Sequence, residues 1–167
     1  MIRPLKPADI TAAGNLAFAA WDSLDEQPDA ARTYMGSPSK VQDDVAERLA
    51  TSVMLGAWLG DRLSGVVNYT SGPDDPYAEY SDIDAAGIRM LGVGLDARGR
   101  GVGAALIHAC IERARSEGKT VLVLHTSPWM HAAQRLYPRL GFHRAPERDF
   151  TPKPEIPLLG YTLDLKP

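Results

Sequence analysis

A glycine-rich turn at residues 98–104, Arg-Gly-Arg-Gly-Val-Gly-Ala, joins two segments with different hydrophobic periodicity. The apolar run before it, residues 88–93, is typical of a strand, and the run after it repeats apolar residues at the spacing of one helical face. Glycines at alternate positions let a backbone approach a ligand without obstructing side chains. The first N–H groups of a helix lack partners within it, and the helix dipole attracts anions there. The segment therefore predicts a phosphate-binding turn between a strand and a helix.

The expected helix covers residues 102–116 and ends at Gly118, which suits a left-handed C′ position. Its predicted buried face comprises Val102, Ala105, Leu106, Ala109 and Cys110. In the strand before the turn, Gly92 and Gly94 flank Val93, and glycine within a strand often marks a bulge or a close backbone approach.

Two nucleotide-binding motifs fit this region less well. Gly99, Gly101 and Ala104 satisfy the dinucleotide fingerprint, but that motif needs an acidic residue about twenty positions later. The next apolar run, residues 120–124, ends in His125, with no acid nearby. Residues 118–120, Gly-Lys-Thr, resemble the end of a P-loop, but Arg113 stands where its first glycine should be. Neither nucleotide class is predicted.

The pattern Arg-x-x-Gly-x-Gly resembles the acetyl-CoA-binding signature of the GNAT family of N-acetyltransferases. Residues 133–142, Ala-Gln-Arg-Leu-Tyr-Pro-Arg-Leu-Gly-Phe, resemble the second motif of that family, and one helix, one strand and one short helix separate the two. The resemblance implies one α/β (α+β) domain over residues 1–167, with a mixed, mostly antiparallel sheet of about seven strands and about four helices.

The resemblance also implies which residues bind acetyl-CoA and which one is catalytic. The expected cofactor-binding residues are Leu91, Gly92, Val93, Arg98, Gly99, Arg100, Gly101, Val102, Gly103, Ala104 and His131. Tyr137 is the expected catalytic acid, because the matching tyrosine of the family reaches the sulfur and a phenol can protonate a leaving thiolate. Met130 stands where many relatives carry asparagine, so Ser127, His131 or a backbone group would replace that polar contact.

The expected reaction is transfer of an acetyl group from acetyl-CoA to a primary amine, by direct attack in a ternary complex. The alternative is a non-catalytic sensor or regulatory module that binds an acyl-CoA. The acceptor would be a small-molecule or peptide amine, and a longer acyl donor stays possible. The sequence assigns no general base, because several acids qualify and Gly87 occupies a place where some relatives carry glutamate. Those acids are Glu79, Asp82, Asp84, Glu147 and Asp149.

The remaining chain fits this domain in outline. In the first half of the chain we expect a strand at 1–6, a helix capped by Asp9, a loop with a short helix at 21–40, a helix at 39–49 capped by Ser39, a hairpin at 52–70 and an acidic loop at 72–86. After the glycine-rich turn and its helix we expect a short helix at 130–137, strands at 139–144 and 158–164, and a surface loop at 145–157. Trp21, Tyr34 and Met35 are candidates for lining the acceptor pocket, and the proline-rich loop 145–157 either covers that pocket or meets a second subunit.

Composition excludes several function classes. A net charge of −3 and a pI near 5.8 argue against a nucleic-acid-binding surface, and no apolar run suits a signal peptide or a membrane span. Cys110, the single cysteine, lies on an apolar helix face and is expected to be buried and inert, which agrees with a cytoplasmic location. The histidines lack metal-ligand spacing, so no metal is expected. Homodimerisation is possible.

Overall fold

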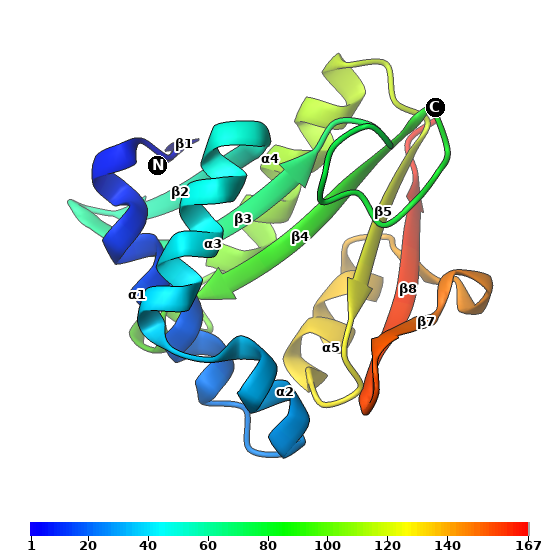
Figure 1. Cartoon of the computed structure of the whole chain (residues 1–167). Coiled ribbons are helices and arrows are strands. Elements are labelled where there is room, and N and C mark those ends of the chain that lie inside the picture. Colours follow the sequence, from blue (N-terminus) through cyan, green and yellow to red (C-terminus); the bar gives the residue numbers. More distant parts are fainter. Residues whose placement is uncertain (167) are drawn as a thin grey trace.

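A computed structural model describes residues 1–166 and contains an eight-stranded sheet flanked by helices (Figure 1). The strands are β1 (Ile2–Pro4), β2 (Val53–Leu59), β3 (Arg62–Thr70), β4 (Ala85–Val93), β5 (Val121–Thr126), β6 (His143–Arg144), β7 (Phe150–Lys153) and β8 (Ile156–Asp164). The helices are α1 (Ile10–Asp22), α2 (Asp29–Met35), α3 (Pro38–Thr51), α4 (Val102–Ser116) and α5 (His131–Arg139). No helix of the described chain is long and apolar enough to cross a membrane.

The sheet has the order β1-β2-β3-β4-β5-β8-β6, and β7 pairs with β8 outside this path. The β4–β5 pair is parallel and all other pairs are antiparallel. The prediction of a mixed, mostly antiparallel α/β fold is confirmed, with one strand and one helix more than expected.

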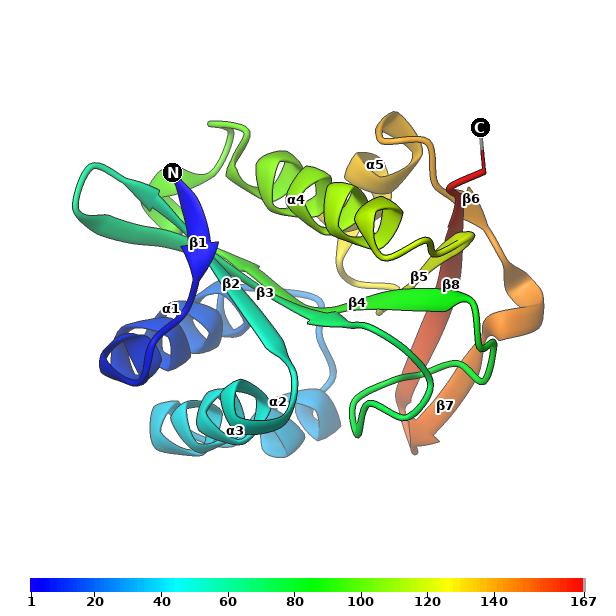
Figure 2. The same ribbon diagram turned by 90° about the horizontal axis from the view of Figure 1, so that it is seen from above.

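Helices cover both faces of the sheet, as Figure 2 shows with α1, α2 and α3 on one face and α4 and α5 on the other. One hydrophobic core lies between α4 and the sheet, with Leu106, Ile107 and Leu124 fully buried or nearly so. The second core lies under α1 and α3 and includes Val45 and Met54. Strand β4 contributes to both cores, whereas the core under α1 and α3 contains no residue of β5.

Helix α4 presents a somewhat different face to the core than the sequence predicts. Its buried residues are Val102, Leu106, Ile107, Cys110, Ile111 and Ala114, whereas Ala105 is exposed. Val102 and Leu106, which the sequence places correctly, approach β3 closely, because a Cβ at Gly65 would lie 2.7 Å from Val102 and 2.9 Å from Leu106. The absence of a side chain at Gly65 therefore lets this part of α4 lie close to the sheet.

The expected strand at 139–144 is wrong for most of its length, because α5 continues to Arg139 and β6 comprises only His143–Arg144. Asp9 precedes α1 as expected, but its side chain makes no capping hydrogen bond to that helix and accepts one from the Lys6 N–H instead.

Two further predictions of element bounds are wrong. Helix α3 begins at Pro38, and its cap is Ser37 rather than Ser39, because the Ser37 hydroxyl accepts a hydrogen bond from the Lys40 N–H. The expected loop 145–157 contains β7, which forms a hairpin with β8 despite its prolines. Strand β7 is exposed along its whole length and lies at an edge, where proline is tolerated.

Cys110 is buried in α4, and burial raises the pKa of its thiol to about 12. Because only the thiolate reacts with alkylating agents, we expect no labelling by iodoacetamide in the native protein and complete labelling in denaturant. Mass spectrometry of the intact chain before and after denaturation measures this. Rapid labelling of the native protein would contradict the assignment of an inert, buried thiol.

Candidate active site

Strands β4 and β5 part in the middle of the sheet. They pair only from Ala85 with Val121 to Ile88 with Leu124, so the later residues of β4 have no partner in β5. Strand β4 also contains one extra residue relative to β3, because Val66 faces Gly92 while Asn68 faces Arg89. This bulge lies at Met90, which has a positive φ of 55°, a few residues before the glycines that the sequence indicated. The Trp21 indole N–H donates to the Leu91 carbonyl over 3.3 Å, which holds the bulged segment against α1.

The glycine-rich turn leaves the N-terminus of α4 open. Gly99 and Gly101 have φ of 72° and 77°, and a Cβ at either position would meet no atom within 4 Å. Gly101 is the N-cap residue, and no side chain caps the first turn of α4. The N–H groups of a 15-residue helix therefore begin beside free space, as an anion site requires.

The two arginines of the turn have different surroundings. The Arg98 guanidinium donates to the Ala20 carbonyl over 3.1 Å and to the Ser23 hydroxyl over 2.8 Å, at the C-terminal end of α1. Its charge thus stabilises the end of a neighbouring helix. Arg100 is exposed. The backbone of the turn, rather than the Arg98 side chain, is what borders the open space.

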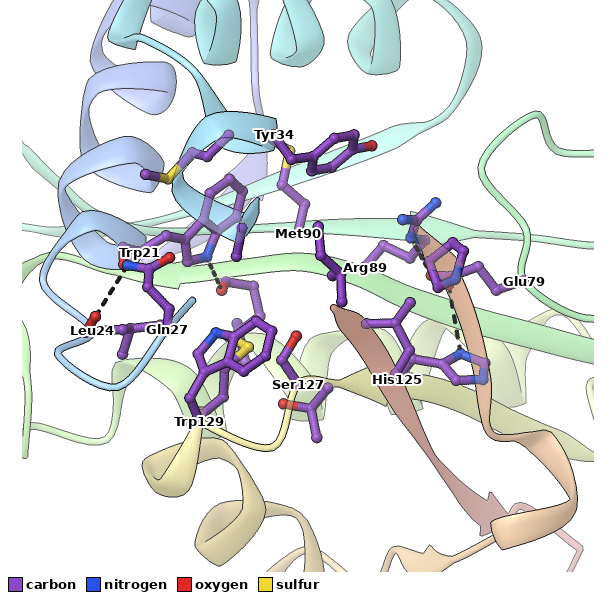
Figure 3. Close-up of a pocket in the computed structure, with 18 of the residues that line it drawn as sticks. Trp21, Leu24, Gln27, Tyr34, Glu79, Arg89, Met90, His125, Ser127 and Trp129 are labelled. Atoms are coloured by element: carbon purple, nitrogen blue, oxygen red, sulfur yellow. Dashed lines mark hydrogen bonds and ion pairs between the residues drawn. The ribbon is translucent and has the colours of Figure 1, made fainter. Parts of the chain in front are cut away.

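A cavity of about 420 Å³ lies where β4 and β5 part (Figure 3). Its lining residues come from the α1–α2 region, both central strands, the segment before α5, and the β7–β8 hairpin. Trp21, Tyr34 and Met35, the predicted acceptor-side residues, all line it. Phe150, Pro152 and Lys153 line it too, so the segment expected as a loop does cover this space.

Tyr137 lines the same cavity from α5. Its side chain is 4% exposed and packs on Phe142 and Tyr161, with ring centroids 5.9 Å and 5.5 Å away. Burial raises the pKa of its hydroxyl well above the usual value, so the phenol stays protonated at neutral pH. The hydroxyl therefore holds a proton that it could donate, although the raised pKa also makes it a weaker acid than an exposed tyrosine.

The segment between β5 and α5 supplies polar groups to the cavity. Thr126 and Ser127 are buried and line it, and the Thr126 hydroxyl has no hydrogen-bond partner within residues 1–166. Met130 also lines the cavity, whereas His131 is exposed and its Nε2 lies 2.7 Å from Glu26. An unpartnered buried hydroxyl is costly unless a ligand or water satisfies it, so Thr126 is a cavity residue that the sequence analysis missed. Its only sequence signal is a polar residue ending an apolar strand.

The far wall of the cavity carries charge. Glu79 forms an ion pair with the Arg89 guanidinium and faces His125 (Figure 3). Burial lowers the pKa of Arg89, although the neighbouring Glu79 opposes that shift. At Gly87 there is no room for a side chain, because a Cβ would lie 2.5 Å from the Thr70 hydroxyl and 2.6 Å from the Tyr80 ring. Glu79 is thus the carboxylate that reaches the cavity from this part of the sheet.

A family comparison agrees with this geometry. The model of the acetyltransferase (GNAT) family matches residues 18–142, which is most of the chain and includes both sequence motifs. The chain belongs to the GNAT acetyltransferase family. The resemblance inferred from the two motifs is therefore confirmed, and the protein is an acetyltransferase.

Solved structures share the GNAT fold with this chain. A GNAT-family protein from Desulfovibrio desulfuricans superposes with a TM-score of 0.76 at 17% identity, covering 99% of both chains. The ribosomal-protein-alanine N-acetyltransferase of Brucella melitensis superposes with a TM-score of 0.69 at 20% identity, and the match covers 98% of this chain and 99% of that protein. The Salmonella typhimurium protein yncA, solved with its cofactor acetyl-CoA, superposes with a TM-score of 0.67 at 18% identity. The match covers 100% of this chain and 94% of yncA. No curated protein matches the chain in sequence.

Proposed function

We propose that this GNAT acetyltransferase moves an acetyl group from acetyl-CoA to a primary amine, by direct attack in a ternary complex. The observation that carries the proposal is a single cavity lined both by the parted strands, through Leu91 and Thr126, and by Tyr137. A thioester arm that enters between β4 and β5 would bring its reactive carbon into this space. The acceptor would enter from the side lined by Tyr34 and Phe150.

Each part of the site has a role in this reaction. The turn 98–104 would hold the pyrophosphate of acetyl-CoA on the N–H groups that begin α4. A backbone N–H of residues 91–93 would donate to the thioester oxygen as negative charge develops there. Tyr137 would give its proton to the leaving thiolate. His131, at the start of α5, would lie beside the pantetheine arm. The acceptor class is a small-molecule or peptide amine.

Thiol release from acetyl-CoA in the presence of a panel of primary amines tests the proposal. The panel should include amino acids, polyamines, aminoglycosides and peptides with free N-termini. We expect at least one amine to give thiol release together with an acetylated product detected by mass spectrometry. Saturable binding of acetyl-CoA without any acetylated product would contradict transfer and favour the sensor alternative.

A further inference from the structure

Two hydrogen-bond acceptors face each other in the cavity with no donor between them. The His125 ring is almost fully buried, with 3% of its side chain exposed, and its Nε2 lies 2.8 Å from the Arg148 carbonyl oxygen. A carbonyl oxygen only accepts, so Nε2 must carry a proton, and in the neutral ring Nδ1 keeps a free lone pair. Glu79 Oε2 lies 3.9 Å from that Nδ1, too far for a hydrogen bond.

Glu79 is fixed as an acceptor. Its Oε1 pairs with the Nε of Arg89, and Arg89 in turn donates to the Tyr77 carbonyl over 3.1 Å. An ionised carboxylate has no proton to donate. The Phe150 ring packs on His125 in an edge-to-face arrangement, with centroids 5.1 Å apart, which restricts rotation of the imidazole. Nδ1 and Oε2 lie 3.9 Å apart, so one atom that carries two N–H or O–H donors can reach both from beside the line that joins them.

We infer that this space binds the ammonium group of the acceptor amine, and that His125 Nδ1 removes its proton. The inference rests on the proposed function, because it names the amine site of that reaction. An ammonium can donate to two acceptors at about 2.8 Å each, and charge-assisted bonds of this kind are the stronger ones. Once Nδ1 is protonated, the resulting imidazolium is stabilised by Glu79 on one side and by the Arg148 carbonyl on the other.

The protons balance in this scheme. The bound ammonium gives one proton to His125 Nδ1, and the neutral nitrogen then forms the C–N bond to the acetyl carbon as the C–S bond breaks. The leaving thiolate takes the Tyr137 proton. The nitrogen loses a second proton, which restores the Tyr137 hydroxyl, and His125 releases the first one to solvent. The products are the amide, the free thiol and one proton.

Charged groups lie around His125 from three parts of the chain. Glu79 approaches from the β3–β4 segment and Arg89 from β4. Asp149 lies close enough that the charge of His125 lowers the pKa of the Asp149 carboxyl, which Arg144 already lowers more strongly. The guanidinium of Arg148 forms an ion pair with Asp82 at 2.9 Å.

Nitrogen NMR of the full chain tests the ammonium site independently of turnover. We expect the neutral His125 ring to show protonated Nε2 and unprotonated Nδ1, and methylammonium chloride to shift the Nδ1 resonance. Sodium chloride at equal ionic strength should not shift it, and Glu79→Gln should abolish the methylammonium response. The exposed His108 on α4 is the internal control.

An unchanged Nδ1 resonance of His125, or the opposite tautomer of its ring, would overturn the inference. A clear response without any acetylated amine would instead count against the proposed transfer.

Kinetics with two nucleophiles test the proton transfer. Ethanolamine is almost entirely protonated at neutral pH, so a base must remove a proton before its nitrogen can attack. Hydroxylamine is largely neutral at this pH and can attack without a base. We expect His125→Gln to slow thiol release to ethanolamine about 100-fold, the lower range for general-base catalysis, and to slow release to hydroxylamine only a few-fold. Acetyl-CoA binding should be unchanged. His143→Gln, at an exposed position on β6, is the matched control. Equal losses with both nucleophiles, or no loss with either, would overturn the base assignment.

Discussion

Replacing Gly101 with glutamate should abolish detectable binding of acetyl-CoA while leaving the fold intact. Gly101 begins α4 with a φ of 77°, and a Cβ there would meet no atom within 4 Å, so the fold has room for the new side chain. The carboxylate would occupy the open space at the helix N-terminus and repel the pyrophosphate. The backbone strain of a non-glycine residue in this region should cost roughly 1–2 kcal/mol of folding free energy.

Gly118→Glu provides a matched control for that strain. Gly118 lies at the other end of the same helix, has a φ of 70°, and also has no atom within 4 Å of a built Cβ. Calorimetric titration with acetyl-CoA should give wild-type affinity for Gly118→Glu and no measurable heat of binding for Gly101→Glu, with similar thermal unfolding of the two variants. Equal affinities would show that the glycine-rich turn does not hold the cofactor.

Tyr137→Phe should reduce turnover by roughly 10²–10⁴-fold, the usual contribution of a positioned proton donor. The substitution removes only the hydroxyl, and the ring contacts with Phe142 and Tyr161 are kept. Burial raises the pKa of Tyr137, so wild-type activity should not decline through loss of the phenol proton as the pH rises to moderately alkaline values. Steady-state thiol release against pH, with the best amine of the panel, measures both effects.

Tyr161→Phe separates chemistry from packing. Tyr161 is a buried tyrosine in contact with Tyr137, with 5% of its surface exposed. Removal of the Tyr161 hydroxyl should leave the turnover within a few-fold of that of the wild-type enzyme. Acetyl-CoA affinity should be unchanged in both variants. A Tyr137→Phe enzyme that keeps full turnover would show that another group or a water protonates the thiolate.

Local sequence signals predicted the elements that carry the proposed cofactor side of the site. The alternating glycines and the apolar helix face defined the turn and α4, and the placement of Tyr137 in a short helix followed from the second motif. These features depend on residues within a few positions of one another, which is what periodicity and turn chemistry can read. The family was recognisable for the same reason.

The proposed acceptor side depends on contacts between residues that lie far apart in the sequence, and no local pattern predicts such contacts. Glu79, Arg89 and His125 come from a loop, a strand and the next strand, and only the folded sheet brings them together. The bulge at Met90 arises from register with β3 rather than from a glycine. Strand β7 was missed because the prolines of the 145–157 segment argued against a strand, although β7 itself contains only Pro152, which its edge position tolerates.

A crystal structure of the complex with acetyl-CoA tests the account most directly, through the distance between the Tyr137 hydroxyl oxygen and the thioester sulfur. We expect the pyrophosphate on the N–H groups of residues 101–103, the pantetheine arm between β4 and β5, and an oxygen–sulfur distance of roughly 3–3.5 Å. Acetyl-CoA bound elsewhere, or bound in the turn with its sulfur beyond hydrogen-bond reach of Tyr137, would contradict the proposed site and its catalytic acid.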